Sequence, residues 1–145
     1  MIMIVASGSL EPGVHKAQWD EPSARFGTND HRRNMLAGLR KAAANLQAAG
    51  CKTIYVDGSF VTTKLEPNDY DAVWDINGVD IGMLDDVFFK LDDGRKEQKS
   101  KYLGEFFPSD VETGERTVML DFFQTEKETG DRKGIVAVSL GGDLG

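Results

Sequence analysis

Val56-Asp57-Gly58-Ser59 and, nine residues later, Asp69-Tyr70-Asp71-Ala72-Val73-Trp74 are the two stretches of this sequence that decide its fold. The first closes a β-branched and aromatic run over 52–56, and the second continues to Ile76, so each predicts a β-strand. Side chains at positions i and i+2 of a strand lie on one face of a sheet. We therefore expect Asp69 and Asp71 to project together, with the apolar and aromatic side chains of the same strand on the opposite face.

Upstream of these strands, apolar residues recur at spacings of three and four, which predicts an amphipathic helix over about 30–49. Any residue of Thr28-Asn29-Asp30 can cap its start. Gly50 stands where a left-handed residue commonly ends a helix. The two strands therefore follow directly on a long predicted helix.

The remaining segments complete the fold prediction. Residues 7–28 are rich in Gly and Pro, so we expect irregular structure held to the core by Trp19, Phe26 and Val14. Two more strands are expected over 117–124 and 134–139, and two more helices over 81–88 and 95–102, the second stopped by Gly104. Because helices alternate with strands, this order favours an α/β (α+β) fold, with a small mixed sheet of about four strands packed with two to four helices.

The length of 145 residues is that of a single domain and argues against a multidomain enzyme. We expect an N-terminal arm over 1–28, one domain over 29–140 and a flexible tail over 141–145. The formal charge of −7, from 24 acidic and 17 basic residues, argues against a surface that coats nucleic acid. It leaves room for a local phosphate site where a metal ion supplies the positive charge.

Cys51 is the single cysteine, so the chain cannot form an internal disulfide. We expect a small buried residue at the start of a strand. The apolar start over 1–6 has no basic region before it and is too short to span a membrane, so a signal peptide is not expected. These features favour a cytoplasmic protein without a membrane partner.

Asp121 is the candidate third carboxylate, because it stands between Leu120 and Phe122 in an apolar strand where an acidic residue is costly to bury. If this strand pairs with the one that carries Asp69 and Asp71, three carboxylates converge. At about 5 Å and an effective dielectric constant near 20, each pair would repel by roughly 3 kcal/mol. A hard divalent cation with oxygen ligands, Mg²⁺ or Mn²⁺, is the expected solution.

Gly58 and Ser59 supply the second half of the candidate site. A glycine directly after a strand allows the backbone to approach a ligand closely, and the Ser59 hydroxyl can donate to a phosphate oxygen. The sequence therefore predicts a loop that holds the phosphates of a nucleotide beside carboxylates that hold the metal.

The Gly-Ser, the Asp-x-Asp and the third-strand Asp together resemble the nucleotidyltransferase superfamily, which has the DNA polymerase β-like fold. The resemblance covers about 29–124 as the minimal core of that fold. A longer set of sequence stretches resembles a family of short bacterial proteins of unknown function assigned to the same superfamily. The stretches that carry this second resemblance are Trp19-Asp20-Glu21, Arg25-Phe26-Gly27, Val56-Asp57-Gly58-Ser59-Phe60, Asp121-Phe122-Phe123-Gln124 and Lys133-Gly134-Ile135-Val136.

The resemblance implies that Asp69, Asp71 and Asp121 ligate the metal, with Asp121 also a candidate general base, and that Gly58 and Ser59 hold a triphosphate. The reaction implied is attack on the α-phosphate of a nucleoside triphosphate, which moves a nucleoside monophosphate to a protein, RNA or small-molecule acceptor. Larger relatives append a helical domain for the base and acceptor, whereas about twenty residues follow Gln124 here. Small relatives of similar length occur in toxin–antitoxin pairs.

Two alternatives stay open. The chain can be a nucleotidyltransferase-like binding module, such as an antitoxin subunit, that acts by pairing with a partner protein. It can also be a metal-dependent phosphohydrolase that uses the same carboxylates with water as the acceptor.

Three basic residues are secondary candidates for phosphate binding. Lys64 stands between the Gly-Ser and the aspartates, while Arg95 and Lys99 share one face of the basic segment 95–102 if it is helical. The expectation for that basic cluster is otherwise a solvated face. His15 and His31 adjoin no motif and are not expected to be catalytic.

Overall fold

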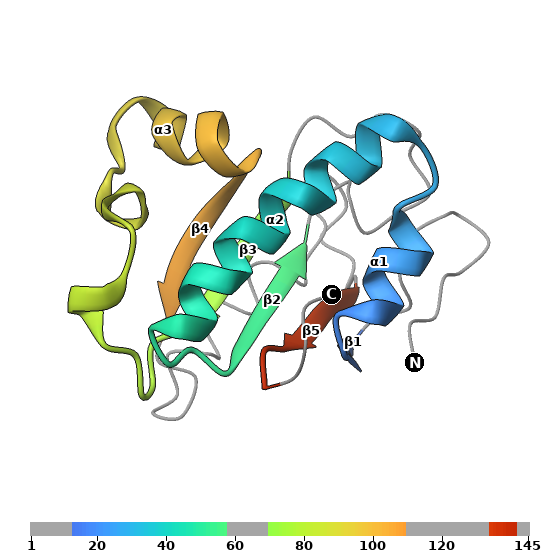
Figure 1. The fold of residues 1–145 in the computed structure, drawn as a ribbon, viewed down its shortest axis with the longest axis horizontal. Helices are drawn as coiled ribbons and strands as arrows, with labels where there is room; N and C mark the ends of the chain where they lie inside the picture. The colour runs from blue at the N-terminus through green and yellow to red at the C-terminus, as the bar shows by residue number, and fades with distance from the viewer. Residues whose placement is uncertain (1–12, 58–69, 110–133, 142–145) are drawn as a thin grey trace.

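The structure is a computed structural model that describes residues 13–57, 70–109 and 134–141. Its strands form one five-stranded sheet with the order β1-β5-β2-β3-β4 (Figure 1). The strands are β1 Gly13–Ala17, β2 Thr53–Asp57, β3 Tyr70–Asp75, β4 Gly104–Ser109 and β5 Gly134–Ser139. The helices are α1 Asp20–Phe26, α2 Asp30–Ala48 and α3 Asp92–Tyr102, with two short 3₁₀ turns, η2 Ile81–Met83 and η3 Asp86–Phe89.

The sheet is mixed, as expected. Strand β2 runs antiparallel to both of its neighbours, β3 and β5, whereas β1 pairs with β5 and β4 pairs with β3 in parallel. The prediction of a small α/β (α+β) fold with two to four helices is therefore confirmed, and the described part of the sheet has one strand more than the four expected.

Helix α2 lies across one face of the sheet and covers it (Figure 1). Its apolar stripe, which includes Leu39, Ala42 and Leu46, packs on side chains from the middle of β2 and β3 such as Ile54 and Ala72. All five of these residues are buried. The helix begins as predicted, because the Asn29 side chain accepts a hydrogen bond of 2.8 Å from the backbone N–H of Arg32.

The end of α2 also agrees with the prediction. Gly50 has a φ of +100°, in the left-handed region that glycine tolerates. Cys51 follows it, is buried before β2 begins and donates its thiol to the carbonyls of Thr53 and Asp75. Burial raises the pKa of this thiol to about 11, so it stays protonated at neutral pH.

The expectation of irregular structure before Thr28 is wrong for the part that the structure describes. Residues 13–17 form β1 and residues 20–26 form α1. Gly13 begins the strand, and Pro22 lies in the first turn of the helix, where a missing backbone N–H costs little. Trp19 and Phe26 are buried as expected, but Val14 is 41% exposed and does not hold this segment to the core.

The helix expected over 81–88 is also corrected. This stretch forms η2 and η3, which are separate 3₁₀ turns capped by the side chains of Asp80 and Asp85. Both aspartates accept hydrogen bonds from backbone N–H groups two residues further on. Such local bonds compete with a continuous helix, which is why the apolar periodicity misled the prediction.

The basic segment is helical from Lys96 on, whereas Arg95, with φ 61° and ψ 37°, lies outside the right-handed helix. The end of the segment also differs from the prediction. Helix α3 stops at Leu103, which adopts a left-handed φ of 65°, and Gly104 instead begins β4. A Cβ atom on Gly104 would lie 2.4 Å from the Tyr70 ring, so glycine is needed for this close approach. The sequence reading missed β4, because its six residues include Pro108 and lack an alternating pattern.

A buried glutamine joins α3 to its surroundings. The Gln98 side chain donates to the carbonyls of Val87 and Phe88 at 3.1 and 3.4 Å, and its oxygen accepts from the Phe106 N–H at 2.8 Å. The rings of Phe88, Tyr102 and Phe106 pack around it with centroid separations of 5.2 to 5.8 Å. This cluster holds α3 and η3 against β4, the edge strand of the sheet.

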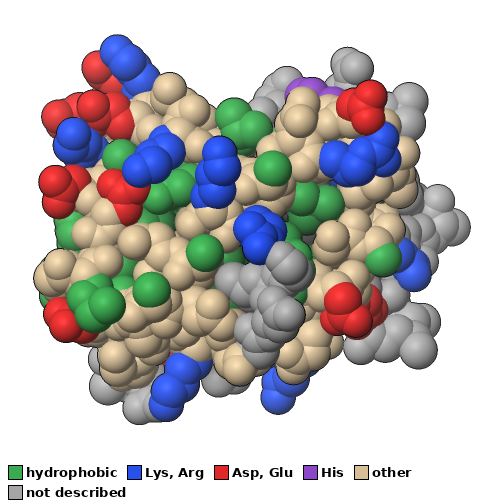
Figure 2. Space-filling model, viewed as in Figure 1, with side chains coloured by type: hydrophobic (Ala, Val, Ile, Leu, Met, Phe, Trp, Pro, Cys, Tyr) green, Lys and Arg blue, Asp and Glu red, His purple; other side chains and the backbone are tan. Residues whose placement is uncertain are grey.

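Asp85 links the same region through charge. It accepts hydrogen bonds from the Lys101 ammonium, from the Tyr102 hydroxyl at 2.6 Å and from the Val87 N–H at 3.1 Å. Burial acts in the opposite direction, but these bonds together lower the pKa of Asp85 to about 2. Around α3 and the turns before it, acidic and basic side chains lie intermixed (Figure 2).

Candidate functional site

The face of the sheet opposite α2 carries the candidate site. Tyr70, Ala72 and Trp74 point to the α2 side, where they are buried in the main core. Asp71 lies between them in the sequence and therefore on the other face, as predicted. We call this side, which is turned away from α2, the open face. It is partly covered, because Val73 and Ile135 are buried on it and Arg95 of α3 stacks on Phe107 at its β4 side.

Three acidic residues lie in one row of the open face. Asp57, the last residue of β2, is the register partner of Asp71 on β3. Asp71 is in turn the register partner of Glu105 on β4. Partners on adjacent strands share a face, so the row Asp57–Asp71–Glu105 runs across three strands. Of these three residues, only Asp71 was predicted from the sequence. Asp57 and Glu105 join it only through the pairing of β3 with β2 and with β4, which no local pattern indicates.

The burial of these carboxylates is uneven. Asp57 is only 4% exposed, whereas Asp71 and Glu105 are half-buried. Like charges directly opposite each other on neighbouring strands destabilise a sheet, and burial of a carboxylate adds to the cost. Neither Asp57 nor Asp71 is without an interaction partner. A binding site for a cation would explain why two carboxylates, one buried and one half-buried, lie opposite each other here.

Antiparallel pairing brings two chain ends together at this row. Strand β2 ends at Asp57 and β3 begins at Tyr70, one residue before Asp71. Gly58 directly follows Asp57 in the sequence, and Asp69 directly precedes Tyr70. The two predicted motifs, Gly-Ser and Asp-x-Asp, are therefore attached to the sheet at neighbouring points.

Five of the predicted site residues lie outside the described residues. These are Gly58, Ser59, Lys64, Asp69 and Asp121. Within residues 13–57, 70–109 and 134–141, no group of three or more His, Cys, Asp or Glu side chains is placed to hold a metal ion. The described part thus places Asp71 next to Asp57, and the metal-binding roles of Asp69, Asp71 and Asp121 all stay predictions.

The two basic candidates on α3 reach the edge strand β4. The Lys99 ammonium is 2.8 Å from a carboxylate oxygen of Glu105, the outer member of the acidic row. The Arg95 guanidinium lies 4.0 Å from the centre of the Phe107 ring, and its Nε donates to the Phe106 carbonyl at 3.3 Å. Lys99 and Arg95 are therefore anchored beside the row rather than forming a wholly solvated face.

Arg95 adopts an unusual backbone conformation. It is the third of three successive residues with positive φ, after Asp93 and Gly94, at values of 52°, 63° and 61°. Such a conformation is strained for a residue with a Cβ atom. Its stacking on Phe107 and its bond to β4 provide the compensation.

The two histidines lie away from the acidic row. His15 is buried and belongs to a row of β1 and β5 side chains, with Val136, that faces α2. His31 is exposed in the first turn of α2. Their role stays as predicted from the sequence.

No curated protein and no solved structure matches the chain significantly. Among the residues that the structure describes, no helix has the length and apolar character needed to cross a membrane. One family model matches residues 4–139, which is nearly the full length. The chain therefore belongs to the family described as a family of unknown function (DUF6932).

Proposed function

We propose that the chain is a metal-dependent nucleotidyltransferase that moves a nucleoside monophosphate from a nucleoside triphosphate to an acceptor. The acceptor hydroxyl forms the new bond to the α-phosphate, and the bond to pyrophosphate, the leaving group, breaks. The single observation that carries this proposal is the pairing of Asp57 with Asp71. It joins the strand that leads into Gly58-Ser59 to the strand that carries Asp-x-Asp, on the open face of the sheet. A phosphate-binding loop and metal-binding carboxylates need this proximity, because a metal held by the carboxylates would supply positive charge to the bound phosphates.

The chemistry of the donor set fits the implied metal. Asp71 and its neighbour Asp57 offer only carboxylate oxygens, which suit Mg²⁺ or Mn²⁺ and not a soft metal. Asp69, Asp71 and Asp121 would hold the ion. When bound, it would neutralise charge on the phosphate oxygens during phosphoryl transfer.

The remaining roles belong to the chain's own groups. The backbone N–H of Gly58 and the Ser59 hydroxyl would donate to phosphate oxygens, with Lys64 as a further cation. Arg95 and Lys99 would bind phosphate at the β4 side, where Lys99 would exchange the Glu105 carboxylate for the ligand. Asp121 would accept the proton of the acceptor hydroxyl.

The test is nucleotide transfer by the purified chain with each labelled nucleoside triphosphate, Mg²⁺ or Mn²⁺, and candidate acceptors. Asp71→Asn should lower the rate at least about 100-fold, because a ligand charge is lost at constant size. Asp75→Asn is the matched control on the same strand and face. The Asn side chain keeps an oxygen that can replace Asp75 Oδ1, which accepts from Asn77 at 3.0 and 2.7 Å.

Transfer that survives Asp71→Asn unchanged would refute the assignment of the site. Complete absence of transfer by the unmodified chain with all four nucleotides and both metals would refute the function. Release of phosphate or free nucleoside monophosphate without transfer would instead support the phosphohydrolase alternative.

A second candidate function, a binding module that pairs with another protein, is favoured by one surface feature. Ile81, Met83, Phe89 and Leu91 are each at least half exposed, all within eleven residues of η2, η3 and the chain between and after them. Exposed apolar side chains gathered in this way are typical of interaction surfaces. Under this alternative, Asp71→Asn should leave the biological effect intact, while Ile81→Asp should abolish it.

We also propose a cytoplasmic location. The single cysteine, Cys51, is buried and protonated, which suits a reducing compartment.

A further inference from the structure

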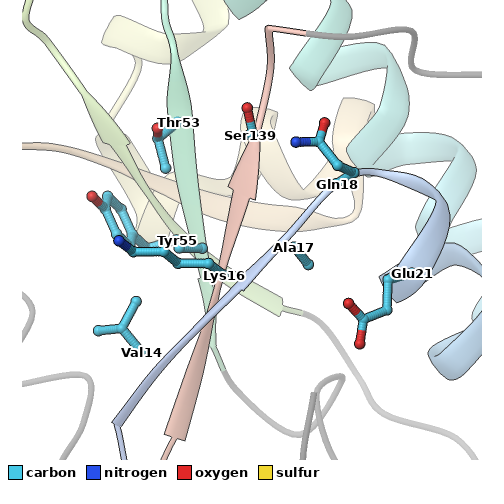
Figure 3. A pocket seen from close by; sticks show the side chains of 9 residues that line it. Val14, Lys16, Ala17, Gln18, Glu21, Thr53, Tyr55 and Ser139 are labelled. Carbon is cyan, nitrogen blue, oxygen red and sulfur yellow. The ribbon is translucent and has the colours of Figure 1, made fainter. Parts of the chain in front are cut away.

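A pocket of about 740 Å³ opens on β1, β5 and β2 (Figure 3). Most of its lining residues belong to the open face. They are Val14, Lys16, Ala17, Gln18, Glu21, Thr53, Tyr55, Ala137 and Ser139. This volume is within the range of small-molecule sites, roughly 300 to 1,000 Å³. No residue predicted from the sequence as a site residue lines it.

The sheet register explains why a hollow exists here. Ala137 on β5 pairs with Lys16 on β1 and with Tyr55 on β2, so the three side chains form one row on the open face. Strands lie about 4.8 Å apart, which places the Lys16 and Tyr55 backbones about 10 Å from each other. Because Ala137 has only a methyl group and lies between two long side chains, the space above it stays empty and forms the floor of the pocket. Figure 3 shows Lys16 and Tyr55 extending over the same side of the sheet.

The chemistry of the lining is polar and cationic at one end. Lys16 contributes an ammonium group, and Thr53, Tyr55 and Ser139 contribute hydroxyls. Thr53 and Ser139 are register partners in the row beside that of Tyr55 and Ala137, so their side chains lie on the same face of the sheet. Val14 and the two alanines supply the apolar part of the wall.

The other end of the pocket differs in charge. Gln18 and Glu21 lie on the far side of β1 from Lys16, where the chain turns into α1 (Figure 3). An anionic group is therefore attracted to the Lys16 end and repelled from the Glu21 end. Hydroxyl groups suit the rest of the pocket, since hydroxyl, amide and carboxylate side chains all bind them.

We propose that this pocket binds a small hydroxyl-rich anion of the sugar-phosphate type. Its phosphate contacts Lys16 and the hydroxyls of Thr53 and Ser139, and its own hydroxyls point toward Gln18 on one side and toward Tyr55 on the other. The size of the pocket, and the one cation and three hydroxyls among its described lining residues, favour this class over a macromolecule, which would need an extended surface. Charge-assisted hydrogen bonds to Lys16 supply the largest share of the affinity.

The position of the pocket gives such a ligand a role. Tyr55 lies two residues before Asp57 on β2 and on the same face, a separation of about 7 Å along the strand. A ligand hydroxyl at this side of the pocket is next to the acidic row. Resting on the proposed function, we infer that the bound sugar phosphate is the acceptor of the nucleotide, so that the acceptor is a small molecule.

The experiment measures binding of ribose 5-phosphate by isothermal titration calorimetry, without nucleotide or metal. Ribose and inorganic phosphate, titrated separately, should each bind at least tenfold more weakly. Lys16→Met should weaken binding at least tenfold, and Ala137→Leu should abolish it by filling the floor. Lys52→Met, which removes the same charge from an exposed lysine outside the lining, should leave the dissociation constant unchanged.

Lys16 is exposed, so its variant should keep the native fold even if Ala137→Leu does not. Ribose 5-phosphate that fails to bind below about 10 mM, or binds equally well to the Lys16→Met variant, overturns the pocket assignment. Binding with the expected variant effects, but without nucleotide transfer to any acceptor, leaves the pocket standing and refutes the proposed function. Binding combined with transfer only to protein or RNA overturns the acceptor role.

Discussion

Asp57 and Asp71 face each other across β2 and β3, at the point where β2 ends. Two acidic side chains, one of them almost fully buried, therefore lie opposite each other at the end of β2, where the chain continues into the Gly-Ser motif. A sheet gains nothing from like charges in this position. The pair is therefore the part of the described structure that most directly calls for a functional explanation.

A divalent cation should stabilise the folded chain if this pair belongs to a metal site. We expect Mg²⁺ at about ten times its dissociation constant to add about 1.4 kcal/mol, which corresponds to a rise in Tm of roughly 4 °C for a chain of this size. Asp71→Asn should remove the rise, and Asp75→Asn should keep it. Differential scanning calorimetry with and without Mg²⁺ measures both. An equal rise in the Asp71→Asn variant would place the metal elsewhere.

The stability of the chain should depend on Asp85 between pH 4 and pH 2. Its pKa falls from 3.8 to about 2 on folding, so the carboxylate stabilises the fold above pH 3.8. This contribution, about 2 kcal/mol at most, is lost as the pH falls through 3.8 toward 2. Urea denaturation should show Asp85→Asn less stable than the unmodified chain at pH 7, with the gap closing at pH 2. A gap that stays constant with pH would show that the charge is not responsible.

Gln98 should be among the most sensitive buried positions. Replacement by Met keeps the volume but leaves the Phe106 N–H and the carbonyls of Val87 and Phe88 without this partner. Each buried polar group that loses its bond costs roughly 1 to 3 kcal/mol, so we expect a loss of about 3 kcal/mol or more. Lys96→Met, on the exposed side of the same helix, should change the free energy of unfolding by less than about 0.5 kcal/mol. Similar values for the two variants would contradict the role of Gln98.

Gly38→Ala should destabilise the chain although alanine favours helices. In an exposed helix this change gains roughly 0.5 to 1 kcal/mol. In α2, however, the added Cβ atom would lie 2.3 Å from the Tyr102 carbonyl oxygen, so α2 and the end of α3 would have to separate. The overpacking should cost about 1 to 3 kcal/mol and outweigh the helix preference. Thermal denaturation followed by circular dichroism measures the sign, and Gly82→Ala, at an exposed site in η2, serves as the control.

The predictable parts of the fold depend on contacts within a few residues. The amphipathic repeat of α2, its Asn29 cap and the left-handed Gly50 are local features, and the structure confirms all three. The alternation around Asp71 likewise placed Tyr70 and Trp74 on the buried face. Trp19 was expected to be buried on its apolar character alone, and it is.

The two missed strands occur where partners distant in the sequence decide the structure. Strand β1 exists because it pairs with β5, more than one hundred residues later. Strand β4 exists because Gly104 fits beneath Tyr70 and because Gln98 binds the Phe106 N–H. No local pattern in either segment indicates a strand, so sequence reasoning had no signal to use.

The sequence by itself determined α2, β2, β3 and β5, the face of β3 on which Asp71 lies and the acidic character of the candidate site, because these follow from local periodicity and residue chemistry. Only the tertiary structure decided that Asp57 and Glu105 join Asp71 in one row, and that Lys16, Ala137 and Tyr55 form a hollow beside it. The physical reason is register. A shift of one residue in any strand pairing would turn each of these side chains to the other face.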